Sequence, residues 1–215
     1  MRLATLAWLP LLLLVSSCET AYYDAMEKVG VHKREILIDR IVEAQESQEE
    51  GKEQFKSALE QFRSVVNFDG GELEATYEKL NDEYEDSVSA AETIHKRIAS
   101  VESVATALFD EWTDELALYS SASLRRDSER QLQSTKKRYE RLLATMHRTE
   151  KTIEPVLASL QDNVLYLKHN LNSRAIASLK GEFANVNADV TKLVSAMQKA
   201  IDESNKFVEE LRGAP

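Results

Sequence analysis

The chain has 215 residues, with few glycines (6) and prolines (3) and a formal net charge of -10. This length allows one domain or at most two, and the scarcity of turn-forming residues favours long helices. The negative charge argues against nucleic acid as a partner and against a broad attraction to anionic lipid.

The first seventeen residues have the pattern of a secretory signal peptide. Arg2 supplies a positive charge, residues 3–15 form an apolar run, and two serines precede Cys18. An apolar run of about 13 residues is short for a membrane-spanning helix, which needs about 20. We therefore expect residues 1–17 to be a cleaved signal rather than part of the fold.

The end of this signal, Val15-Ser16-Ser17-Cys18, resembles the lipobox of bacterial lipoproteins. That resemblance implies acylation of Cys18, which makes residues 18–21 the lipidated N-terminus, and we expect residues 22–215 to form one domain. Cys18 is the only cysteine and cannot form an intramolecular disulfide, although a chance cysteine after an ordinary signal peptide is the alternative. Each buried acyl methylene contributes about 0.8 kcal/mol, so two or three chains would anchor the protein permanently to a membrane.

The residue after the lipobox bears on localisation. In Gram-negative lipoproteins, Asp at this position commonly retains the protein in the inner membrane, and most other residues permit transfer to the outer membrane. Glu19 therefore favours the outer membrane, with the protein facing the periplasm, although its acidity leaves the inner membrane open.

Four heptad-patterned segments follow, at about residues 22–66, 72–119, 124–171 and 174–211. Their apolar positions alternate in steps of three and four, which specifies narrow seams and left-handed supercoiling. Four such stripes need one another for burial, so we expect an all-α fold, an elongated antiparallel four-helix bundle with coiled-coil-like packing. The first stripe includes Ile41, Ala44, Gln48, Gly51, Phe55, Ala58, Phe62 and Val65, and the second runs from Leu73 through Ile94, Trp112 and Glu115 to Tyr119.

The breaks between segments predict the topology. Gly70-Gly71, Ser120–Ser123 and Asn170–Ser173 combine residues that end helices with residues that cap the next one. Loops this short make neighbours antiparallel, which groups the start of the first segment, the Ser120 turn and the C-terminus beside the membrane. Gly70 and Asn172 then lie at the distal end of a rod roughly 65–70 Å long.

Pro155 interrupts the third segment. It removes a backbone donor and clashes with the preceding turn, so the helix is either kinked or split near Thr152. Because the apolar stripe continues through the proline, we favour a kink.

Charge is unevenly distributed along the chain. Acidic residues dominate from Glu43 to Glu115, whereas the third segment begins with basic residues from Arg125 to Arg141. We expect these faces to pair across helix interfaces, as edge charges do in coiled coils. Docking of an acidic partner is the alternative.

No constellation of residues predicts catalysis, a cofactor or a metal. Glu92 and His95 have the spacing of a di-iron bundle ligand pair, but no second glutamate–histidine pair of that kind accompanies them. The sole cysteine is assigned to lipid, and no nucleophile or phosphate-binding motif occurs. Trp112, Tyr77 and Tyr84 lie on the seam and are expected in the core.

One stretch, from Val156 to Leu179, is apolar on more than one helix face. It is covered either by residues near Tyr22, Tyr23, Met26 and Val29 or by a partner protein. The antiparallel order of four helices places this stretch far from Tyr22, which favours its coverage by a partner protein. The candidate partner-binding residues are Val164, Leu165, Tyr166, Lys168, His169, Asn170, Asn172 and Arg174.

Four parts of the chain carry a family resemblance: Cys18–Tyr23, Glu53–Gly71, Ser123–Ser128 and Lys168–Leu179. Together they resemble the proteobacterial lipoproteins grouped as DUF2959, a domain of unknown function. The resemblance spans essentially the whole mature chain and implies a helical envelope lipoprotein, without catalytic residues or a substrate.

These patterns predict a non-enzymatic, membrane-tethered helical rod that binds another envelope protein. Two alternatives remain, a bundle that opens and inserts into a bilayer and a ligand- or metal-binding bundle. The identity of the partner and the oligomeric state stay open.

Overall fold

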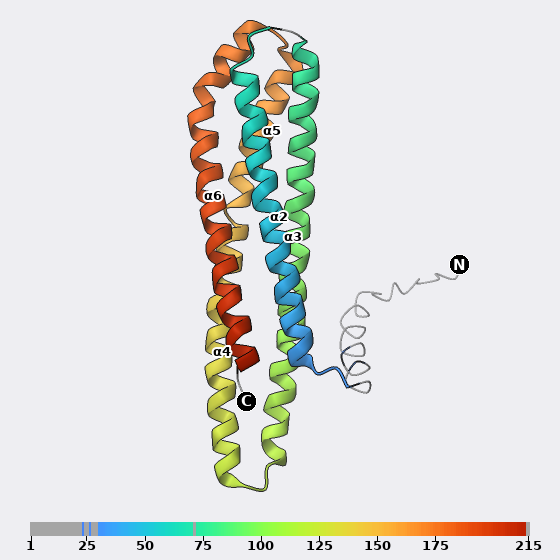
Figure 1. Cartoon of the computed structure of the whole chain (residues 1–215), viewed down its shortest axis with the longest axis vertical. Coiled ribbons are helices and arrows are strands. Elements are labelled where there is room, and N and C mark those ends of the chain that lie inside the picture. Colours follow the sequence, from blue (N-terminus) through green and yellow to red (C-terminus); the bar gives the residue numbers. More distant parts are fainter. Residues whose placement is uncertain (1–22, 24–25, 27–29, 71, 214–215) are drawn as a thin grey trace, which may run out of the picture.

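A computed structural model describes residues 23, 26, 30–70 and 72–213 of the chain (Figure 1). These residues form helices joined by short turns, and no strand occurs among them. The helices are α2 (Lys33–Val66), α3 (Leu73–Glu115), the 3-10 turn η1 (Leu116–Leu118), α4 (Ala122–Glu150), α5 (Ile153–His169) and α6 (Ser173–Gly213).

The predicted four-helix bundle is confirmed. α4 and α5 follow one another and together take the place of one of its four long helices (Figure 1). α2 packs mainly against α3 and α6, while α4 and α5 lie against α3 and α6 on the opposite side. The turns at Gly70 and Asn172 share one end of the rod, as the antiparallel count predicted (Figure 1). We call this the distal end.

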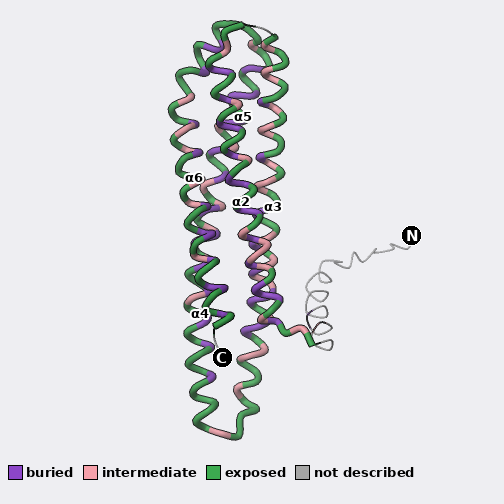
Figure 2. The backbone as a smooth tube through the Cα atoms, in the orientation of Figure 1, coloured by how far each residue is buried: buried purple, intermediate pink, exposed green. Residues whose placement is uncertain are grey.

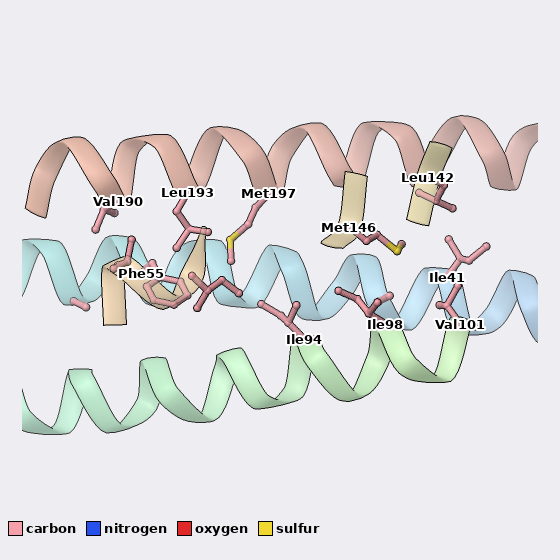
Figure 3. Packing of buried hydrophobic residues seen from close by; sticks show 14 of the residues in the cluster. Ile41, Phe55, Ile94, Ile98, Val101, Leu142, Met146, Val190, Leu193 and Met197 are labelled. Atoms are coloured by element: carbon pink, nitrogen blue, oxygen red, sulfur yellow. The ribbon is translucent and has the colours of Figure 1, made fainter. Parts of the chain in front are cut away.

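The core is a stack of apolar side chains that follows the predicted stripes (Figure 2). Phe55 of α2, Ile94 of α3 and Met197 of α6 are fully buried in its centre (Figure 3). Gly51 permits the close approach of α2 to α3, because a Cβ atom there would lie 2.7 Å from Ile94 Cδ1. Gly51, a residue of the predicted apolar stripe, is therefore required for the close packing of α2 on α3.

The first segment is interrupted at Gly30 rather than continuous, because Tyr23 and Met26 are helical and a turn separates them from α2. α2 starts at Lys33 rather than at Tyr22, and Gly30 just before it has a φ of +87°. The amide of Val31 donates to the carbonyl of Met26 at 3.0 Å. A left-handed glycine followed by a bond of this span is the usual C-terminal cap of a helix, so the chain turns at Gly30 before α2 begins.

The third segment is split rather than kinked, against the preferred expectation. α4 ends at Glu150, Lys151 and Thr152 form a turn, and α5 begins at Ile153. Pro155 is thereby the third residue of α5, where a backbone amide needs no helical partner. The split removes the cost that a proline has inside a helix.

Cross-helix charge pairs form, but not chiefly between α3 and the basic start of α4. Arg138 of α4 pairs with Glu210 of α6 at 3.3 Å, and Arg97 of α3 pairs with Glu43 of α2 at 2.7 Å. Of the basic stretch from Arg125 to Arg141, Arg138 thus pairs across a helix interface with a residue of α6 rather than of the acidic stretch from Glu43 to Glu115.

Candidate functional site

The distal end carries an apolar surface on α5 and the turn that follows it. Leu165, Tyr166 and Leu171 are 47%, 39% and 41% exposed, and they are large hydrophobic side chains. Lys168 and Arg174 are exposed beside them in the sequence. We call these five residues, together with the exposed His169, the distal patch.

The helix periodicity of α5 explains why these side chains face outward. Leu160, Val164 and Leu167 are at most 3% exposed and face the core, so the intervening residues 165 and 166 turn away from it. Val164 was expected in a partner-binding surface, but it lies in the core and is not available there.

Two asparagines of the predicted site have backbone partners. The Asn172 side-chain oxygen accepts hydrogen bonds from the amides of Arg174 and Ala175 at 3.0 and 3.1 Å, which caps the start of α6. Asn170 donates to the Tyr166 carbonyl at 2.9 Å. Both residues therefore shape the turn on which the distal patch is displayed.

The patch combines apolar and cationic character. Residues 163–181 contain Lys168, Arg174 and Lys180 and no aspartate or glutamate, in a chain with 37 acidic residues. Tyr166 leans toward α6, where its hydroxyl donates to Ser178 Oγ at 3.3 Å. This surface therefore suits a partner that offers apolar side chains and negative charge.

A histidine–carboxylate cluster, not predicted from sequence, lies where α4 ends. Glu150 Oε1 is 2.5 Å from His95 Nδ1 of α3, and Glu150 Oε2 is 3.1 Å from His147 Nδ1. His147 Nε2 lies 2.8 Å from Glu102 Oε1. The only sequence signal was the three-residue spacing from His147 to Glu150, because the partners on α3 are about fifty residues away.

The electrostatics of this cluster centre on Glu150. Partial burial raises the pKa of its carboxyl group, but hydrogen bonds from His95 and His147 outweigh burial and hold the pKa below its usual value of 4.5. An open groove of about 470 Å³ lies beside it and is lined by Glu92, His95 and Leu157 among others. Within the described part of the chain, no group of three or more metal-ligating side chains could hold a metal ion.

The predicted lipidation residue, Cys18, lies outside the described residues, as does the signal segment. Among the helices that the structure does describe, none combines the length and the apolar content needed to cross a membrane.

Comparison with known proteins identifies one family. The family described as "Protein of unknown function (DUF2959)" matches residues 22–211, which is nearly the whole helical part of the chain. No curated protein and no solved structure matches.

Proposed function

Because the chain belongs to the DUF2959 family of proteins of unknown function, we propose a role from its surfaces: a non-enzymatic envelope lipoprotein that binds another envelope protein. The protein is tethered through acyl chains on Cys18 and faces the periplasm, in the outer membrane rather than the inner one. Its bundle acts as a rod that presents the distal patch away from the membrane.

The observation that carries this proposal is the position of the distal patch. α2 starts at the end of the bundle opposite the Asn172 turn, so residues preceding Lys33 join the rod far from Leu165 and Tyr166 (Figure 1). α2, α3 and α6 have 34, 43 and 41 residues, and α2 alone spans roughly 50 Å. A tether at the opposite end therefore leaves the distal patch free to bind a partner well away from the membrane surface.

The chemistry of the patch defines the partner. Three half-exposed apolar side chains provide the centre of a small interface, and Lys168 and Arg174 provide a cationic rim. Such a surface fits an acidic protein segment with one or two apolar side chains.

The tether is tested by replacing Cys18 with serine in the producing bacterium. The unaltered protein should fractionate with outer membranes and incorporate a labelled fatty acid, and Cys18→Ser should do neither. Glu19→Asp should move the protein to inner membranes if the second residue directs sorting. Membrane association of Cys18→Ser equal to that of the parent would refute the tether.

The partner site is tested by photo-cross-linking in cells from a reactive amino acid at position 165. The matched control is position 161, an exposed residue of the same helix one turn earlier. We expect a discrete protein adduct from position 165 only, and its loss when Lys168 and Arg174 are both changed to glutamate. Equal adducts from both positions, or none from either, would refute the proposed patch.

A further inference from the structure

The rod has a second apolar end, formed by the turn between α3 and α4. This hairpin extends past the start of α2 and the end of α6, as Figure 1 shows. Lys33 at the start of α2 pairs with Glu111 at 3.2 Å, and Arg138 pairs with Glu210 near the end of α6. α3 and α4 therefore continue beyond these pairs without cover from the other two helices.

The surface of the hairpin end differs from most of the rod in its lack of charge. Residues Leu116–Leu124 are nine consecutive residues without Asp, Glu, Lys or Arg, although 30% of the chain is charged. Leu118, Tyr119 and Leu124 are 81%, 42% and 58% exposed. We call residues 116–126, which end in the exposed Arg125 and Arg126, the proximal tip (Figure 2).

We infer that the proximal tip is a second membrane contact, which docks on a bilayer surface containing anionic headgroups. Leu118 and Leu124 enter the boundary of the acyl chains, and Tyr119 lies at the headgroup level, where its ring and hydroxyl are both accommodated. Arg125 and Arg126 face the lipid phosphates. This inference rests on the proposed tether at Cys18.

The length of chain between the tether and the bundle supports the docking. Tyr23 is 5% exposed, and its hydroxyl lies 3.0 Å from Ser103 Oγ on α3. The five-residue step from Cys18 to Tyr23 spans at most about 18 Å. From Ser103 to Ser120 the hairpin advances roughly 25 Å at the helical rise.

A fully extended linker therefore does not carry Cys18 appreciably beyond the proximal tip. When the rod stands upright, the tip lies at the membrane surface wherever the acyl chains of Cys18 are inserted. Residues 116–124 of the tip carry no charge, which such a position requires, since charged side chains in the acyl region would resist insertion. The exposed Asp114, Glu115 and Asp127 border the tip, so attraction to anionic headgroups is confined to Arg125 and Arg126, and the apolar side chains carry the rest of the contact.

A second copy of the chain is a poorer occupant of this surface. Like the distal patch, the proximal tip offers three exposed apolar side chains and is smaller than stable protein interfaces, which bury about 800 Å² on each partner; unlike the distal patch, it lies at the end where the tether would place a bilayer. A bilayer needs no matching surface and accepts a small convex tip.

The test uses the full protein purified from membranes and reconstituted into phosphatidylethanolamine–phosphatidylglycerol vesicles. If Cys18 carries lipid, Leu118→Cys provides the only free thiol, which is labelled with an environment-sensitive fluorophore. Leu165→Cys is the matched control, because it is a half-exposed leucine at the other end of the rod. Quenching by lipids with spin labels on the acyl chain then reports depth.

We expect quenching several-fold stronger at position 118 than at position 165, together with a blue-shifted emission at 118 only. Changing Arg125 and Arg126 to glutamine should weaken quenching at 118 in anionic vesicles. Equal quenching at both positions would mean that the rod lies flat, and no quenching at either would mean that the tip is in water. Both results would overturn the inference.

Two controls separate this inference from its premise. A free thiol on Cys18 of the unaltered protein would refute the tether itself, whereas a blocked Cys18 without quenching at 118 would refute the tip alone. A signal at 118 that depends on the number of proteins per vesicle would indicate contact between copies, and it would also overturn docking on lipid.

Discussion

Gln48 offers a direct test of how the core of the rod is built. Its side chain is fully buried on the apolar stripe of α2, and neither its amide nitrogen nor its amide oxygen has a hydrogen-bond partner among the described residues. Burying an amide without partners costs about 1–3 kcal/mol in protein mutational data. Gln48→Met should therefore stabilise the bundle.

The size of this effect follows from what the substitution leaves unchanged. Methionine is unbranched and close to glutamine in length, so it fills the same space without creating a cavity. The two side chains also lose similar rotamer entropy on burial. The gain should therefore approach the full amide cost, about 1–3 kcal/mol, and each kcal/mol should raise Tm by about 2–4 °C in a domain of this size.

The assay is urea unfolding followed by far-UV circular dichroism, with m unchanged between parent and variant. Thr149→Val is the matched control, because Thr149 is also buried but its hydroxyl has partners, the carbonyls of Thr145 and Ala196, both at 3.1 Å. This isosteric change should destabilise the protein by about 1 kcal/mol. If Gln48→Met destabilised the protein as well, the amide would have a partner such as an internal water, and the reasoning would be refuted.

Three further changes test other parts of the structure by the same assay. Glu150→Gln should lower the free energy of unfolding at pH 7 by about 0.5–1 kcal/mol, since the carboxyl is near the surface. Hydrogen bonds from His95 and His147 hold the pKa of Glu150 below 4.5 in the folded protein. The stability that Glu150 contributes is therefore fully present above pH 4.5 and is lost as the pH falls through the lowered pKa. A stability difference between parent and Glu150→Gln that stays constant down to pH 3 would contradict the cluster. Pro155→Ala should change stability by less than about 1 kcal/mol, because the proline is in the first turn of α5; a gain near 3 kcal/mol would indicate a continuous helix. Leu142→Ala, in the core at 1% exposure, should cost about 2–5 kcal/mol, and a smaller cost would mean that the core collapses around the site.

The sequence predicted the helices because their stripes repeat at a fixed period. The segments at 72–119 and 174–211 match α3 with η1 and α6 to within a few residues, and the antiparallel order follows from short turns. The break at Gly30 was missed because apolar residues on both sides of it continue the pattern. A single glycine does not reveal from sequence whether it adopts the left-handed conformation seen here.

The histidine–carboxylate cluster could not be predicted in the same way. Contacts across helices depend on how far one helix slides along another, and the heptad pattern leaves that register undefined. His95 was considered with Glu92 on its own helix, whereas its partner is Glu150 on α4. The distal patch was only partly predicted for a related reason, since Val164 and Leu165 are equally apolar and only packing tells them apart.

The end of the second predicted core stripe lacks cover at the place where a membrane contact is inferred. The stripe predicted for residues 72–119 continues past α3 to Tyr119, but α2 has 34 residues and α3 has 43, so the last turns of α3 have no α2 beside them. Tyr119 is consequently 42% exposed at a position where the pattern requires burial. Ordinary helix ends are polar, and a stripe that extends past its helical cover needs another apolar environment to be stable. The bilayer contact inferred above would supply that environment, whereas water does not, and it would account for the lack of charged residues from Leu116 to Leu124.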